Sequence, residues 1–174
     1  IALLAERGVA VSHNPGSNLK LASGVARVPE LLRAGVTVSL GTDGPASNNN
    51  LDMFEEMRLA ALIHKGVSGD PTAVPASEAL RLATEYGAKS IGLKEVGALA
   101  AGNKADFIAL DLNQAHFLPR TDLISHAVYS ASAKDVAHVW VDGRQVVKNG
   151  ECLTMDEERI KHEAQAAFEG LLSR

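Results

Sequence analysis

The sequence predicts an α/β fold in which parallel strands alternate with helices. The segment Gly8-Val-Ala-Val-Ser is followed 27 residues later by Gly35-Val-Thr-Val-Ser. An amphipathic stretch precedes each copy, at residues 1–7 and 28–34. Each copy therefore has the order helix, glycine stop and short β-branched strand. Such short apolar runs suit strands that are buried on both faces, as in parallel sheets.

The chain begins with Ile1 instead of Met, and apolar residues already recur there at helical spacing. We expect residues 1–7 to be the interior of a helix and the chain to be a fragment of a longer protein. Two strand–helix units can neither close a barrel nor form a wide sheet. The remaining strands are therefore expected upstream of Ile1.

A polar, glycine-containing segment follows each predicted strand, at residues 13–18 and 41–50. The carboxyl ends of parallel strands lie at one edge of a sheet, and α/β folds place their sites there. His13 and Asp43 occupy equivalent positions after the two strands. Their side chains could therefore converge on one ligand.

Asp43 is the strongest single candidate for a functional residue. It follows an apolar strand and lies between Thr42 and Gly44, so we expect its carboxylate to project into a pocket and not into bulk water. A carboxylate suits a divalent metal, and a carboxylate joined to imidazoles suits zinc or iron. The alternative is an Asx-turn or a helix cap, because Asp and Gly are common in turns. Spacing alone favours the turn.

The other polar residues of these loops are open to two interpretations. A single histidine beside a loop, such as His13, is more often a hydrogen-bonded structural residue than a metal ligand. Ser47 and the asparagines at 48–50 would either donate to a polar substrate or satisfy the loop backbone. We expect the remaining histidines to be structural or solvent-facing: His64, His116, His126, His138 and His162.

Two helices and a β-rich region are predicted after the second loop. Apolar residues recur near helical spacing over residues 51–65, and residues 75–84 open with a proline followed by good helix formers. Strands and turns dominate from about Val96. Within that region Asp142-Gly143 lies between two apolar runs and predicts a hairpin. A charged amphipathic helix is expected over roughly 156–172.

The composition is that of a globular protein without an obvious macromolecular partner. Of 174 residues, 46% are hydrophobic and 22% charged, and the net charge is −4. Acidic and basic residues are mixed, which argues against nucleic acid as a partner. No apolar run approaches the roughly 20 residues of a membrane-spanning helix. The single Cys152 excludes an internal disulfide and mildly favours a reducing compartment, so we expect a soluble cytoplasmic protein.

Several catalytic signatures are absent from the sequence. It contains no Gly-x-Ser-x-Gly elbow, no Walker loop and no Rossmann fingerprint. The sequence therefore gives no support to covalent serine catalysis or to hydrolysis of nucleoside triphosphates.

Taken together, residues 11–24 and 40–58 closely resemble the amidohydrolase superfamily. Within it, the match is nearest to the methylthioadenosine/S-adenosylhomocysteine deaminases and their chlorohydrolase relatives. Residues 96–111 and 139–144 continue the resemblance, which thus covers essentially the whole chain. This coverage makes the resemblance more specific than any single motif.

The resemblance implies a metal-dependent (β/α)8 barrel joined to a small β-sandwich. Residues 1–93 would form the last two strands and the helices of the barrel. Residues 94–150 would form a segment of the sandwich, and residues 151–174 the C-terminal helix.

The resemblance also implies roles for the loop residues. Asp43 would be a catalytic residue that ligates one divalent metal, zinc first, with iron or manganese as alternatives. His13 and Asn14 would line the site, and Ser47 and Asn48 would lie beside the metal aspartate. The His-x-His pair and the other metal histidines of the superfamily have no counterpart in this sequence. The chain therefore lacks a complete site.

The activity implied is hydrolytic deamination of an adenosine-type thio-nucleoside with release of ammonia. Asp43 would hold the metal and accept the proton of the attacking water. Triazine chlorohydrolase, guanine or cytosine deaminase, and a catalytically inactive fragment are the alternatives. The expected partner is a small purine nucleoside or related heterocycle, bound to a homo-oligomer.

Overall fold

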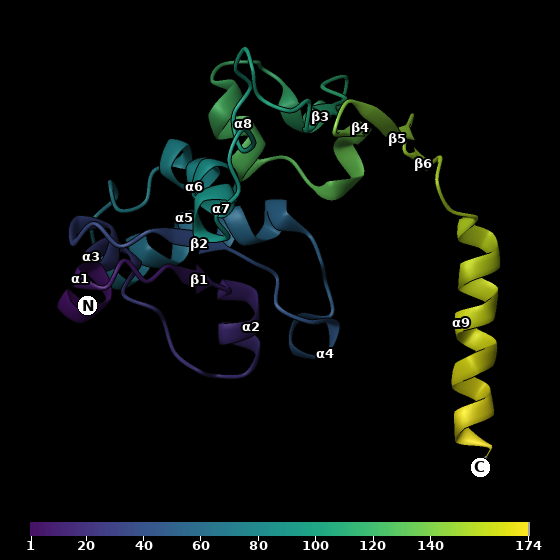
Figure 1. Ribbon diagram of the computed structural model, residues 1–174, viewed down its shortest axis with the longest axis horizontal. Helices are drawn as coiled ribbons and strands as arrows, with labels where there is room; N and C mark the ends of the chain where they lie inside the picture. Colours follow the sequence, from purple (N-terminus) through teal and green to yellow (C-terminus); the bar gives the residue numbers. More distant parts are fainter. Residues whose placement is uncertain (174) are drawn as a thin grey trace.

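Two parallel strands lie at the centre of the N-terminal part of the molecule. The computed structural model describes residues 1–173 (Figure 1). Strands β1 (Val11–His13) and β2 (Val38–Leu40) pair in parallel, and His13 lies opposite Leu40. All three residues of β2 are buried. The predicted parallel arrangement and the mixed α/β class are confirmed.

A helix precedes each of these strands, as the repeat predicts. Helix α1 (Ala2–Glu6) leads into β1, and helix α3 (Val28–Arg33) leads into β2. Gly8 and Gly35 adopt φ values of 62° and 79° directly after these helices. Left-handed backbone of this kind ends a helix, and glycine adopts it without a steric penalty.

Short helices occupy the two polar segments that the sequence analysis interpreted as loops. Helix α2 (Pro15–Lys20) follows β1, and helix α4 (Pro45–Asn48) follows β2. Each begins with a proline at a position where the missing N–H has no helical partner to lose. Both helices are too short to show a hydrophobic period in the sequence.

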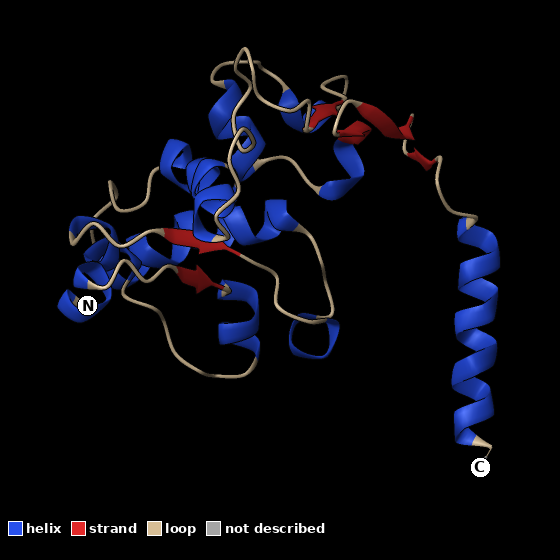
Figure 2. Ribbon diagram, viewed as in Figure 1, coloured by secondary structure: helices blue, strands red, loops and turns tan. Residues whose placement is uncertain are grey.

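Three helices cover the parallel pair (Figure 2). Helix α5 (Met53–Ser68) and helix α6 (Ala76–Ala83) correspond to the two helices predicted from spacing. Helix α7 (Glu85–Ser90) follows α6 directly. All three contact β2. The buried residues of α5 and α6 join those of α3 and β2 in one hydrophobic core, and the partly buried Tyr86 of α7 packs against it.

A further helix lies in the region that was expected to be β-rich. Helix α8 (Leu123–Tyr129) begins at Asp122, whose side chain accepts hydrogen bonds from the backbone of Ile124 and Ser125. It packs against α5 and α6, where Val128 is fully buried. The expectation of strands and turns from Val96 is therefore only partly correct. The helix forms because the Asp122 cap and the burial of its apolar face against α5 and α6 stabilise it more than the local sequence favours strands and turns.

The second sheet has four antiparallel strands in sequence order. They are β3 (Phe107–Leu110), β4 (Val136–Val141), β5 (Arg144–Lys148) and β6 (Glu151–Cys152). Asp142 and Gly143 join β4 to β5 with φ values of 50° and 77°. Two successive positive φ values are typical of the tight turns that match strand twist. The predicted hairpin is confirmed. Two single 3-10 turns, η1 (Ala115–Phe117) and η2 (Ala133–Asp135), flank α8.

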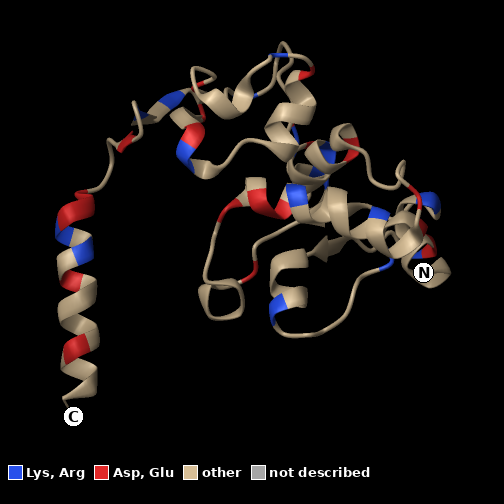
Figure 3. Cartoon of the chain, turned by 180° about the vertical axis from the view of Figure 1, so that it is seen from behind, with Lys and Arg blue, Asp and Glu red and all other residues tan. Residues whose placement is uncertain are grey.

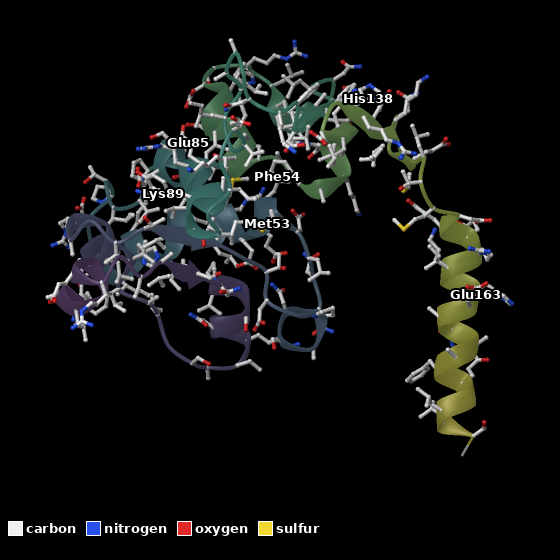
Figure 4. All side chains as sticks on the ribbon, viewed as in Figure 1. Met53, Phe54, Glu85, Lys89, His138 and Glu163 are labelled. Carbon is white, nitrogen blue, oxygen red and sulfur yellow. The ribbon has the colours of Figure 1, made fainter. Side chains whose placement is uncertain are left out.

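The C-terminal helix α9 (Glu157–Leu172) extends away from the rest of the chain in Figure 1. It has no buried residue, and both acidic and basic side chains lie along it (Figure 3). Figure 4 shows Glu163 on this helix, far from Phe54 in the main body. Among the helices of residues 1–173, none is long and apolar enough to cross a membrane.

Candidate functional site

Asp43 lies three residues beyond the end of β2 with its backbone in the left-handed region, at φ 61°. Non-glycine residues adopt this conformation at a cost, although aspartate tolerates it better than most. The side chain is exposed, so the expectation that it avoids bulk water is wrong for this chain. Within residues 1–173 the short helices α2 and α4 flank it without enclosing the carboxylate.

Two hydrogen bonds hold the Asp43 carboxylate in place. The backbone N–H of Gly44 donates to Oδ1 at 2.8 Å, and the Ser17 hydroxyl on α2 donates to Oδ2 at 2.8 Å. The Gly44 N–H, and then the Ser17 hydroxyl, lower the pKa of Asp43, with a smaller contribution from Ser47. The group is therefore an ionised carboxylate oriented from two sides.

Asn48 joins the Asp43 loop to the interior. Its side-chain Nδ2 donates to the carbonyl oxygen of Thr42 and to Oε1 of Glu56 on α5, both at 2.8 Å. From the other side, Lys20 on α2 donates to the carbonyl of Ala46 at 3.0 Å. The segment after β2 is thus fixed to both α2 and α5.

Asn14 directly follows β1 and lies beside Gly41, the residue after β2. Its Oδ1 accepts from the Ser12 hydroxyl at 3.2 Å. A Cβ atom on Gly41 would come within 2.9 Å of Asn14 Nδ2. The absence of a side chain at Gly41 therefore allows the asparagine to fit against β2 beside the Asp43 loop.

His13 faces the interior. It is 2% exposed, and its Nε2 lies 3.2 Å from Nε2 of His64 on α5. Burial, and then the neighbouring His64, lower the pKa of His13 to about 4. Its side-chain partner is therefore a helix residue beneath the strand ends and not the Asp43 loop.

Sequence reasoning missed two buried residues of α5 that matter to this region. His64 was expected to be structural or solvent-facing, and its burial at 3% exposure excludes the solvent-facing alternative. Glu56 was not singled out and is 1% exposed. A signal existed for His64, because it follows Met57, Ala60 and Ala61 at the spacing of one helix face.

The residues of this chain fit one ligand of a divalent cation. Asp43 supplies an ionised oxygen donor of the kind that such cations bind. Within residues 1–173, no group of three or more His, Cys, Asp or Glu side chains is placed to hold a metal ion.

The family profile described as the amidohydrolase family matches residues 1–146, which is most of the chain. The chain belongs to the amidohydrolase family. Among curated amidohydrolase relatives, a 5-methylthioadenosine/S-adenosylhomocysteine deaminase of Dictyoglomus thermophilum is 56% identical over 170 residues. The match covers 97% of this chain and 40% of that protein. A protein of the same name from Bacillus cereus is 54% identical, over 98% of this chain and 39% of its own length.

Solved structures give the same family assignment. A zinc-bound adenosine deaminase from Xanthomonas campestris has a TM-score of 0.95 and 39% identity, and the match covers 99% of this chain and 39% of that one. An atrazine chlorohydrolase from Arthrobacter aurescens, complexed with zinc, has a TM-score of 0.88 and 31% identity, over 95% and 37% of the two chains. This amidohydrolase chain thus spans about 40% of the length of the curated relatives named above.

Proposed function

We propose that the complete protein is a zinc-dependent hydrolase that deaminates 5-methylthioadenosine and S-adenosylhomocysteine. The identity of 53–56% to deaminases of that name, over nearly the whole of this chain, carries the proposal. The zinc bound to the adenosine deaminase and to the atrazine chlorohydrolase supports the choice of metal.

In this proposal residues 1–93 are the last two strands and the helices of a (β/α)8 barrel. Residues 94–150 belong to a small β-sandwich, which β6 (Glu151–Cys152) continues. The C-terminal helix expected over 151–174 is shorter than that range, because α9 spans Glu157–Leu172. The parallel β1–β2 pair supports the first part, and the antiparallel order of β3 to β6 supports the second. Active sites of such barrels lie at the carboxyl ends of the strands, where Asp43 is found.

Asp43 would supply one metal ligand from this chain. The metal, when bound, lowers the pKa of a water molecule and so supplies the nucleophile. The Asp43 carboxylate would accept the proton that the attacking water loses. Water would add at the amino-bearing carbon of the purine, the carbon–nitrogen bond would break, and the amino group would leave as ammonia after it gains the proton that the water lost. Gly44 and Ser17 favour this role because they keep the carboxylate ionised and oriented.

The other residues predicted to line the site would lie around Asp43, some at the surface and one in the interior. Ser47 and Asn48 lie on its own loop, and Asn14 lies at the end of the neighbouring strand. We propose that these three line the substrate site. His13 would line its base, where it rests on His64.

The test compares substrates and two matched variants of the complete protein. We expect ammonia from 5-methylthioadenosine and S-adenosylhomocysteine, and loss of both zinc and turnover in Asp43→Asn. Asp70→Asn is the control, because Asp70 is an exposed turn residue. Wild-type zinc content and turnover in Asp43→Asn would refute the proposed role.

A chlorohydrolase is the second candidate, because the atrazine enzyme shares 31% identity over 95% of this chain. Measurement of chloride release from atrazine beside ammonia release from the nucleosides separates the two activities. Chloride without ammonia would establish the second candidate. Guanine and cytosine belong in the same ammonia assay as alternative substrates.

A catalytically inactive chain is the alternative of a different class. Zinc analysis of the purified 174-residue chain addresses it, because stoichiometric zinc would contradict that alternative. We further propose that the complete enzyme is a homo-oligomer, which sedimentation measurements would test.

A further inference from the structure

Glu56 is a buried carboxylate in the first turns of α5, and the proposed reaction does not use it directly. Only 1% of its surface is exposed. Within residues 1–173, the ion pairs do not include Glu56. Burial of a polar group is costly unless it is hydrogen-bonded, and Glu56 accepts a hydrogen bond on each of its two oxygens.

The two oxygens of Glu56 bind the two segments that follow the parallel strands. The backbone N–H of Gly16, on α2 after β1, donates to Oε2 at 3.0 Å. The side-chain Nδ2 of Asn48, on α4 after β2, donates to Oε1 at 2.8 Å. One side chain on α5 therefore fixes α2 and α4 relative to each other.

Both segments that bind Glu56 also contact Asp43 or the residue before it. Ser17, the residue after Gly16, donates its hydroxyl to Oδ2 of Asp43. Asn48 uses the same Nδ2 to donate to the carbonyl of Thr42, directly before Asp43. The backbone and the carboxylate of Asp43 are thus held by neighbours that themselves rest on Glu56.

The approach of α2 to Glu56 is close enough to require glycine at position 16. A Cβ atom on Gly16 would lie 2.4 Å from Glu56 Oε1 and 3.0 Å from Asn48 Nδ2. Even the smallest side chain there would have to displace the carboxylate. The contact is therefore specific to this pair of residues.

A carboxylate fits this position better than a neutral amide. Both of its oxygens accept hydrogen bonds, whereas a glutamine has one acceptor oxygen and one NH2 donor. The NH2 group would face either the N–H of Gly16 or the Nδ2 of Asn48, donor against donor. Glutamine therefore keeps the shape of the glutamate side chain and loses one of its two hydrogen bonds.

We propose that Glu56 is a positioning residue that sets the orientation of the Asp43 carboxylate toward the metal. The proposal rests on the proposed function, because it assumes that Asp43 is a metal ligand. Residues that orient a ligand from behind typically contribute ten- to hundredfold to metal affinity.

The experiment measures zinc affinity of the complete protein by competition with a chromogenic chelator, below the melting temperature. We expect Glu56→Gln to weaken zinc binding about tenfold, and kcat to recover at saturating zinc while KM stays unchanged. Glu55→Gln is the matched control on the same helix, because within residues 1–173 the Glu55 side chain accepts from the side chain of Asn50 and not from α2 or α4. A purely structural role would lower the melting temperature and leave zinc affinity unchanged.

Gly16→Ala is a second test of the proposal if Glu56→Gln does not fold. The added Cβ atom displaces the Glu56 carboxylate without changing residue 56 itself. We expect it to weaken zinc binding in the same direction. Wild-type zinc affinity in the folded variants, while Asp43→Asn loses zinc, would overturn the positioning role alone. Wild-type zinc affinity in Asp43→Asn would instead overturn the proposed function.

Discussion

His13 and His64 form a hydrogen-bonded imidazole pair in the interior, with their Nε2 atoms 3.2 Å apart. One Nε2 must carry a proton and the other must accept it, which is the pattern of two neutral rings. Burial lowers the pKa of both histidines, in His13 to about 4. Protonation of the accepting ring would set two donors face to face and bring a charge into the core. The pair therefore makes stability depend on pH.

The first prediction is that the protein loses stability as the pH falls from about 6.5 to about 4. In this window His13 is protonated in the unfolded chain and neutral in the folded one. The unfolded state binds more protons, so the free energy of unfolding rises with pH. The shift of His13 corresponds to about 3 kcal/mol across the window. Urea unfolding midpoints at a series of pH values measure it.

His13→Gln should flatten this pH profile, because glutamine does not titrate and can still bind His64. His162→Gln is the control, since His162 is exposed on α9. An unchanged slope in His13→Gln would show that other groups cause the acid sensitivity.

The second prediction separates the backbone of Asp43 from its side chain. Asp43→Gly and Asp43→Ala both remove the carboxylate, but only glycine adopts φ 61° without strain. We expect the glycine variant to be more stable than the alanine variant by about 1 kcal/mol. Denaturant unfolding measures the difference.

The same pair of substitutions at Leu62 should give the opposite order. Leu62 is half exposed and lies within α5, where alanine favours the helix and glycine does not. Equal stabilities of the two Asp43 variants would mean that the left-handed backbone at this residue carries no strain.

The third prediction contrasts two helix caps. Asp52 caps α5 through the N–H of Phe54 and also accepts from the N–H of Ala133, which leads to β4. Asp52→Ala should cost about 1 to 2 kcal/mol of unfolding free energy. Asp156 caps α9 by accepting from Arg159, but no residue of α9 is buried.

Asp156→Ala should therefore increase amide exchange in the first turn of α9 and leave the global unfolding midpoint unchanged. A shift of the midpoint comparable to that of Asp52→Ala would show that α9 packs on the rest of the protein. The two aspartates thus report whether a cap stabilises a packed or an isolated helix.

The sequence predicted those elements whose signals are local. Gly8 and Gly35 stop helices before β-branched strands, and the Asp142-Gly143 pair between two apolar runs marks a tight hairpin turn. The short helix after each strand escaped prediction because four to six residues do not establish a 3.6-residue period. Its proline signal also suits a loop.

Asp43 itself could be predicted from the sequence, whereas the contacts of the buried residues that support the candidate site, Glu56 and His64, could not. The donor to Glu56 on α2 lies 40 residues away in the sequence, and the partner of His13 lies 51 residues away. Contacts between residues so far apart in the sequence cannot be predicted from the spacing of neighbouring residues. A glutamate on an amphipathic helix is ordinarily a surface residue, and only the packing of the two strand-end segments buries Glu56.

The last prediction is a stabilising substitution at Gly66, within α5. This glycine is exposed, has no positive φ, and a Cβ atom added there would meet no atom within 4 Å. Alanine would reduce the entropy of the unfolded chain at no steric cost in the helix. Gly66→Ala should therefore raise the free energy of unfolding by about 0.5 to 1 kcal/mol. Gly143→Ala in the β4–β5 turn should lower it, because φ there is 77°. Thermal unfolding of both variants beside the parent gives the two signs. An unchanged midpoint in Gly66→Ala would contradict this prediction and would mean that α5 frays before residue 66.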